Sequence, residues 1–287
     1  MTAAIPLLFN GVAYGMLLFI IAIGLSVTMG MMNFVNLAHV SLATVGGYAA
    51  AAAVDTLHWP FALALVLSAL AGALVASVLE RGLLRFFYGS DDLTQVLLTI
   101  GVVFMSIASF AYLFGPGFRP LTVPAGLSGQ VDVGPFQLER YRLFLVTVGI
   151  ALAALLYLAL ERTRYGAMIR ACVDNRRAAA GNGLNTGRVF AITFALGGAL
   201  AGLGGGLSAN LLGLDPNFPL RYLVYVLIVV AVGGMGSIAG TFLAAVTIGV
   251  ADVVGKYLVP ELGGFVIYAV AVGIMLKRPQ GLLGKAA

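Results

Sequence analysis

Polar side chains interrupt long apolar runs at one place near the start of the sequence. Within MMNFVNLAHVSL, residues 31–42, Asn33, Asn36 and His39 follow one another at intervals of three. At this spacing they share one face of a helix. Amide and imidazole groups are costly in apolar surroundings, so this face should lie against protein, water or a cavity. Two interpretations stay open: the residues line a polar route or begin a broken helix, or they form hydrogen bonds that simply hold helices together.

A second interruption occupies a matching position in the other half of the chain. Asn36 is the predicted cap of a run that carries Ser41, Thr44 and Tyr48. The stretch GGMGSIAG, residues 233–240, begins with Gly233 and Gly234 and separates two further apolar runs. Glycines permit a break in a helix, and matching breaks in two halves are typical of a transport pathway. The alternative is a tight turn between two ordinary helices.

Composition identifies the surroundings in which these elements must fold. Hydrophobic residues make up 61% of the 287 residues and charged residues only 9%, with a mean hydropathy of +1.05. These values indicate an integral membrane protein. Nine apolar runs can be counted, and two are short for a span of about 20 residues. We therefore expect an all-α polytopic membrane protein: a single domain over residues 1–287, with about eight transmembrane helices and broken or re-entrant segments near 31–40 and 232–240.

Basic residues predict the orientation, since Lys and Arg in short loops stay on the cytoplasmic side. They gather at Arg81 and Arg85, in residues 162–188 with six arginines, and in the C-terminal tail. Placing all three groups inside puts the N-terminus outside and the C-terminus in the cytoplasm. Residues 161–187 then form a cytoplasmic loop and residues 115–141 the largest outside loop. This bias accounts for the pI near 9.5 without a nucleic-acid partner.

A glycine repeat marks one of the later runs. Gly198, Gly202 and Gly206 recur every four residues and so form a groove along one helix face. Such a groove lets another helix approach closely. Close packing is one reading, and a surface that slides during a conformational change is the other.

The cytoplasmic loop has the pattern of an amphipathic helix. Tyr165, Met168, Ile169 and Cys172 fall at i, i+3, i+4 and i+7, while Arg170 and Asp174 lie on other faces. The stretch is expected to continue through Ala179 and to end at Gly181. Such a helix can lie on the bilayer or dock on a partner protein. A loop that only sets orientation would need the arginines alone.

Several kinds of chemistry are not predicted. The single cysteine leaves no disulfide framework, and no Cys/His cluster has the spacing of a metal site. The chain has no G-x-x-x-x-G-K-[ST] motif, so it does not bind nucleotide through a P-loop. We expect no cofactor in this chain. If transport is driven by ATP, partner subunits bind the ATP and Mg²⁺.

Five stretches together resemble a known family. They occur in the order seen in permease subunits of branched-chain amino acid ABC importers: the run from NGVAYGMLLF to LATVGGY, the loop RYGAMIRACVDNRRAAAGNGLN, the glycine-rich run after it, VAVGGMGSIAGTFLAA and the tail RPQGLLG. The short N-terminus is more similar to the smaller of the two paralogous permeases. The chain departs from the pattern at Arg176 and Arg177, where many relatives carry an acidic residue, and at Val40, where glycine is common.

The resemblance implies the permease half of an ATP-driven importer in a bacterial inner membrane. Implied partners are a paralogous permease, two cytoplasmic ATPase subunits, a periplasmic substrate-binding protein and the lipid bilayer. Residues 115–141 would be periplasmic, and the loop would carry the coupling helix that docks on the ATPase. The implied coupling residues are Tyr165, Met168, Ile169, Arg170, Cys172, Asp174, Ala179 and Gly181. Two alternatives remain: a stand-alone carrier or channel with broken helices, and a purely structural membrane subunit.

Overall fold

The computed structural model describes residues 4–32, 34–119, 121–134 and 136–283. Within these ranges the chain forms eleven α-helices, one short 3₁₀ helix and one β-hairpin. The elements are α1 (Ala4–Met32), α2 (His39–Asp55), α3 (Phe61–Gly82), η1 (Leu84–Phe87), α4 (Asp92–Phe114), β1 (Gln130–Val133), β2 (Phe136–Glu139), α5 (Arg140–Arg162), α6 (Arg164–Asp174), α7 (Arg176–Gly181), α8 (Thr186–Leu211), α9 (Phe218–Gly233), α10 (Ile238–Leu258) and α11 (Gly263–Lys277).

All nine apolar runs are helical, which confirms the predicted helical class. Among the described residues, α1, α3, α4, α5, α8 and α10 are long and apolar enough to cross a membrane. The shorter apolar helices α9 and α11 have 16 and 15 residues, and α2 has 17. A straight span needs about 20 residues, so these three helices are short for a complete crossing. The expected all-α fold needs one addition, the antiparallel hairpin β1–β2 in the predicted outside loop.

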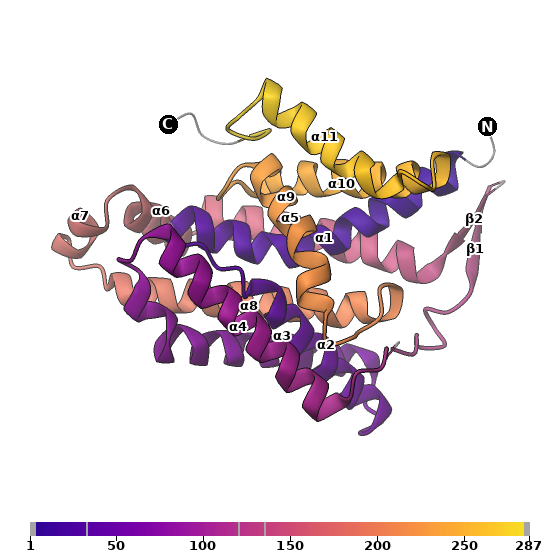
Figure 1. Ribbon diagram of the computed structural model, residues 1–287, viewed down its shortest axis with the longest axis horizontal. Helices are drawn as coiled ribbons and strands as arrows, with labels where there is room; N and C mark the ends of the chain where they lie inside the picture. Colours follow the sequence, from indigo (N-terminus) through magenta and orange to yellow (C-terminus); the bar gives the residue numbers. More distant parts are fainter. Residues whose placement is uncertain (1–3, 33, 120, 135, 284–287) are drawn as a thin grey trace.

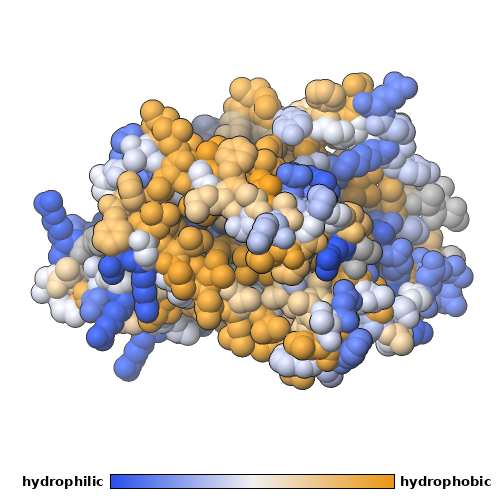
Figure 2. Space-filling view, turned by 60° about the horizontal axis from the view of Figure 1, so that its bottom comes forward, coloured by the Kyte–Doolittle hydropathy of each residue, from blue (hydrophilic) through white to orange (hydrophobic). Residues whose placement is uncertain are grey.

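Helix α1 lies at the centre of the bundle. In the most apolar stretch of 18 residues in α1, 89% of the stretch is buried inside the protein. The corresponding shares for α3, α4 and α5 are 22%, 17% and 11%. Its neighbours come from late in the chain, because Gly11 packs against Val250 of α10 and Gly24 against Gly197 of α8. The outer helices instead present apolar side chains outwards, and Figure 2 shows a hydrophobic band with hydrophilic residues at both ends. This arrangement suits a bundle surrounded by lipid.

Glycines on α8 allow the closest helix contacts. Gly198, Gly202 and Gly206 lie against Ser68, Gly72 and Ala76 of α3, and the Ser68 hydroxyl donates to the Gly202 carbonyl. On a neighbouring face of α8, a side chain at Gly205 would overlap the carbonyl of Ala43 in α2. The groove predicted from the glycine repeat is thus filled by another helix. The other reading, a surface that slides during a conformational change, stays a prediction.

Both predicted interruptions are present, at residues 34–38 and 234–237 of the described ranges. They meet at the last turns of α1. The Gly236 amide donates to the Ser26 carbonyl at 3.0 Å, and the Thr241 hydroxyl donates to the Ser26 hydroxyl at 2.8 Å. A side chain at Gly30 would overlap the Cα of Gly236. The second interruption is therefore a tight turn, as one of the two interpretations predicted, and this turn also packs against the end of α1.

The three basic groups lie towards one end of the bundle. Arg81 and Arg85 line the same cavity as Arg188 at the start of α8. The C-terminal tail packs on the end of α9, where the Leu282 amide donates to the Val232 carbonyl at 2.7 Å. Figure 1 shows α6 and α7 towards this end, with the hairpin and the start of α1 at the other.

Candidate functional site

Asn36 shapes the entry to α2, although not as the predicted helix cap. Its side-chain oxygen accepts from the Ala38 amide at 3.1 Å, which forms a local turn. The N-cap position belongs to Ala38, whose side chain cannot cap. The Asn36 amide nitrogen is buried and has no hydrogen-bond partner among the residues placed by the structure. Asn33, the third member of the predicted polar face, lies outside the described residues.

Two residues that the sequence reasoning missed support this interruption from α4. The Val35 amide donates to the side-chain oxygen of Gln95 at 2.9 Å, and the Leu37 amide donates to the Thr99 hydroxyl at 3.3 Å. Gln95 and Thr99 are buried one turn apart in an otherwise apolar run. They satisfy backbone groups that would otherwise be unpaired in the membrane. The signal was available, since polar residues at i and i+4 within an apolar run indicate a polar partner.

His39 is deeply buried beside α1. Its side chain is 1% exposed, and a side chain at Gly24 would lie 2.9 Å from its Nε2 atom. Gly24 precedes the end of α1 by eight residues, so the imidazole lies about 12 Å in from that end at 1.5 Å per residue. Neither ring nitrogen has a hydrogen-bond partner within the described ranges. The ring lies near the Ile21 backbone of α1 but makes no hydrogen bond of normal geometry with it, so the polar atoms of the imidazole contribute little to holding the bundle together.

The remaining predicted route residues of α2 have separate surroundings. The hydroxyls of Ser41 and Ser106 are 2.8 Å apart, which joins α2 to α4. The Tyr48 ring stacks on Phe114 with centroids 4.3 Å apart and on Phe110 at 5.2 Å. Thr44 donates to the Val40 carbonyl of its own helix at 3.2 Å. All three predicted residues are buried, so any route along this face is closed in the observed conformation.

The predicted route glycines of the second interruption are also packed. Gly233 lies against Gly240 and Thr241, and Gly234 ends α9 with φ +92°. Gly281 of the tail, with φ +84°, covers Gly234. The first interruption reaches α1 at Gly24 through His39, and the second reaches it at Ser26 and Gly30. The two interruptions therefore share the final turns of α1 but do not enclose an open channel there.

The predicted coupling segment forms two helices rather than one. Asn175 breaks the predicted continuation after Asp174 and caps α7, where its side chain accepts from the Ala178 amide at 2.9 Å. Thr163 caps α6 in the same way. Helix α7 ends at Gly181, and Gly183 follows with φ +83°. The predicted end of the segment is thus confirmed.

The apolar stripe of α6 faces the chain itself. Ile169, Cys172 and Ala179 are buried in a small cluster with Val189 and Phe190 of α8. The Tyr165 hydroxyl contacts the Val189 carbonyl at 3.3 Å, and burial raises the pKa of Tyr165, which keeps this donor protonated. The stripe therefore fastens α6 to α8 instead of presenting a docking surface. Met168 is partly buried, while Asp174 and Gly181 are exposed.

Arg170 closes the corner between α5 and α6. Its guanidinium donates to the Leu160 carbonyl and lies 3.7 Å from the Glu161 carboxylate. A side chain at Gly166 would overlap the same Leu160 carbonyl, so the corner needs glycine there. Among all the residues that the structure describes, no group of three His, Cys, Asp or Glu side chains could hold a metal ion.

The accessibility of the single cysteine, Cys172, shows whether α6 is packed against α8. Cys172 is 2% exposed, so we expect slow maleimide labelling of the native protein in detergent. Gly166→Ala should speed labelling by about tenfold or more, because overpacking costs about 1–3 kcal/mol and 1.4 kcal/mol is tenfold in opening. Gly181→Ala is the matched control, since that position has open space. Equal rates for both variants would contradict this packing.

Comparison with known proteins extends the argument beyond this geometry. Residues 7–275 match the family described as "Branched-chain amino acid transport system / permease component". The permease protein LivH of the high-affinity branched-chain amino acid transport system of Escherichia coli K12 is 28% identical, with 97% of this chain and 94% of the relative covered. BraD of Pseudomonas aeruginosa, described in the same terms, is 26% identical with 97% and 95% covered. A probable LivH of Methanocaldococcus jannaschii is 24% identical with 96% and 91% covered. No solved structure matches the chain significantly. The resemblance carried by its five sequence stretches is thereby confirmed, and the chain belongs to the permease component family of branched-chain amino acid transport systems.

Proposed function

We propose that this chain is one permease half of an ATP-driven importer for branched-chain or other small hydrophobic amino acids. It would form a single domain over residues 1–287 of a bacterial inner membrane protein, with the N-terminus outside and the C-terminus in the cytoplasm. A paralogous permease would complete the pathway, and a periplasmic binding protein would deliver substrate. Two cytoplasmic ATPase subunits would bind ATP and Mg²⁺, so this chain itself would not be catalytic.

The observation that supports this proposal best is the attachment of α6 to α5 and α8. Its apolar stripe is fastened to α8, and Arg170 ties it to the end of α5. The opposite face, with Ala167 and Ala171 one turn apart, is exposed at the basic end of the bundle. A helix that is attached to α5 and α8 on one face and exposed on the other can transmit the movement of a docked partner to these two long helices. A loop that only sets orientation needs no such attachment.

The polar residues before and at the start of α2 fit a half-pathway. His39 and Asn36 carry buried polar atoms without hydrogen-bond partners inside the described chain, which is costly unless a conformational change uses them. Their closed surroundings suit a state that excludes solute. Movement of α6 would reach this region through α8 and α1, because α1 contacts both helices.

Co-purification from the native membrane tests the ATPase partner. Wild-type chain should retain an ATPase, whereas Ala167→Glu combined with Ala171→Glu should release it, since two buried like charges would face the interface. Ser128→Glu, at an exposed position in the predicted periplasmic loop, is the control and should retain the partner. Cys172 labelling should stay slow in all three proteins, which shows that α6 is still seated. Recovery of the wild-type chain alone, moving substrate in vesicles without ATP, would instead favour a stand-alone carrier.

A further inference from the structure

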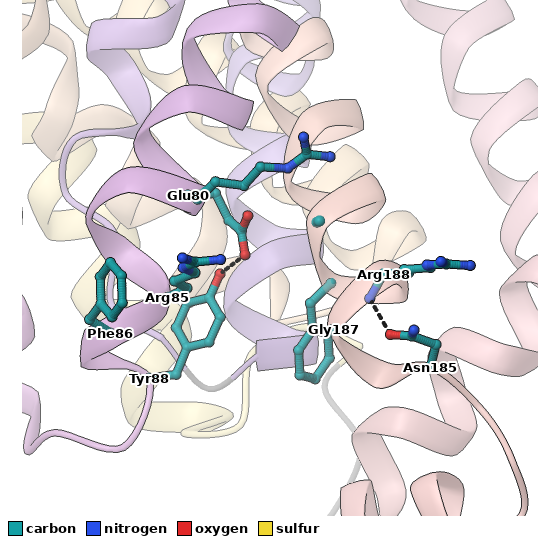
Figure 3. A pocket seen from close by; sticks show the side chains of 10 residues that line it. Glu80, Arg85, Phe86, Tyr88, Asn185, Gly187 and Arg188 are labelled. Atoms are coloured by element: carbon teal, nitrogen blue, oxygen red, sulfur yellow. Dashed lines mark hydrogen bonds between the residues drawn. The ribbon is translucent and has the colours of Figure 1, made fainter.

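A cavity of about 540 Å³ opens at the basic end between α3, η1 and α8. Arg81, Arg85 and Phe86 line one side, and Asn185 and Arg188 line the other. Figure 3 shows Glu80 and Tyr88 facing each other beside Arg85, with Arg188 and Asn185 across from them. The cavity shares no residue with α6, α7 or the polar face of α2, so it belongs to neither site described above.

The charge of the cavity favours an anion. Three arginines line it, and Glu80 is the one carboxylate among its lining residues. Glu80 is 4% exposed and accepts from the Tyr88 hydroxyl at 2.9 Å, and with three arginines against this one carboxylate the lining keeps an excess of positive charge. Within the described ranges, none of the three arginines has a carboxylate at ion-pair distance, whereas Arg142, Arg170 and Arg221 each have one. Arg85 instead stacks on Phe86, 4.7 Å from the ring centroid. The arginines are exposed and able to turn towards a ligand.

Exposed apolar stripes run from this cavity into the hydrophobic band. On α3, Leu70, Leu74 and Val78 are 61%, 65% and 62% exposed, and Arg81 follows them on the same face. On α8, Ile192 and Leu196 are 50% and 51% exposed, and Arg188 precedes them by one turn. Two helices that pack together thus each place an arginine at the head of an apolar stripe. A ligand that fits both features carries an anionic group and a long apolar tail.

We propose that this cavity binds the phosphodiester headgroup of an anionic phospholipid, with its acyl chains lying along α3 and α8. The guanidinium groups match phosphate oxygens in geometry and charge. Basic pockets between membrane helices on the cytoplasmic side are suited to such headgroups. A docked acidic protein would use the arginines but would leave the apolar stripes without a role. The proposal depends on the membrane location of the chain and not on the ATP-driven mechanism.

Native mass spectrometry of the purified permease with phosphatidylglycerol or phosphatidylcholine of the same acyl chains tests this site. Phosphatidylglycerol should bind more tightly to the wild-type chain. Arg81→Ala combined with Arg188→Ala should weaken its binding by about twenty-five-fold, or about fivefold for each arginine, and should weaken the binding of zwitterionic phosphatidylcholine much less. Arg164→Ala removes an exposed arginine of α6 outside the cavity and should change nothing. Glu80→Gln should tighten phosphatidylglycerol binding, an effect that loss of folding cannot produce.

The same titrations with competitors separate the sources of phosphate. Inorganic phosphate and glycerol 3-phosphate, added at the lipid's concentration, should not displace phosphatidylglycerol. Displacement by either would identify a site for a free anion and overturn the lipid proposal. Equal binding of the two lipids, or equal loss in Arg164→Ala and the double variant, would overturn it as well. Release of a co-purified ATPase by the double variant with lipid binding intact would assign the cavity to a protein partner.

Discussion

Valine at Gly205 should abolish recovery of the folded protein. The glycine lies where α8 meets α2, and a side chain there would overlap the backbone carbonyl of Ala43. Backbone cannot turn aside as a flexible side chain can, so the two helices would have to separate. Ordinary overpacking costs about 1–3 kcal/mol, and we expect a loss beyond this range. Because α8 also packs on α1 and α3, separation would disturb the centre of the bundle.

Gly101→Val is the matched control for this prediction. Gly101 lies within α4, is exposed, and has no heavy atom within 4 Å of an added Cβ. Both substitutions place a β-branched residue in an apolar helix, so propensity effects are shared. Size-exclusion profiles and thermal unfolding in detergent should show a sharp loss for Gly205→Val and little change for Gly101→Val. Native-like unfolding of Gly205→Val would mean that α2 and α8 are not in close contact.

Leucine at His39 should greatly reduce transport without loss of stability. Neither imidazole nitrogen makes a hydrogen bond of normal geometry in the described parts of the chain, so a leucine of similar size removes buried polar atoms that are unsatisfied in this conformation. Stability should be unchanged or higher, since an unsatisfied buried group costs about 1–3 kcal/mol. If the imidazole serves the moving solute, uptake should fall by about tenfold or more, corresponding to at least about 1.4 kcal/mol.

Thr44→Val provides the contrast within the same helix. The Thr44 hydroxyl already donates to the Val40 carbonyl, so its loss should lower stability slightly and leave uptake nearly unchanged. Substrate uptake into vesicles and the melting temperature should be measured on the same preparations. Full uptake by His39→Leu would show that the residue only fills space. A fall in stability that accompanies the fall in uptake would instead assign His39 to packing.

Helices and their interruptions were predictable because they depend on local composition. Each apolar run became a helix, and the two short runs beside asparagines and glycines lie beside the actual breaks. The sequence could not show that both breaks meet on α1, since the contact between Gly30 and Gly236 joins residues far apart in the chain. The hairpin was missed because its two strands of four residues carry little periodicity.

The candidate sites show the same limit more sharply. The stripe of Tyr165, Ile169 and Cys172 correctly indicated one covered face of a helix, but not that α8 covers it. Hydrophobic periodicity shows that one face of a helix is buried but does not show which element buries it. The spacing of Gln95 and Thr99 indicated a polar partner, but only the fold shows that this partner is the backbone of residues 35–37. Arg81 and Arg188 were read as determinants of orientation, whereas their shared cavity depends on how α3 packs against α8.

The central position of α1 sets the order in which this protein can assemble. Ribosomes produce α1 before every helix that surrounds it, yet its contacts at Gly197 and Val250 are with segments made much later. The most apolar stretch of α1 has a mean hydropathy of 2.2, which suits a stable independent span. Helix α1 can therefore remain in lipid or beside the insertion machinery until α8 and α10 have been made. The helices made between them, α3 to α5, are those that keep lipid contact in the finished bundle. Biogenesis therefore begins with the innermost helix, and the surroundings of α1 are complete only when α10 has entered the membrane.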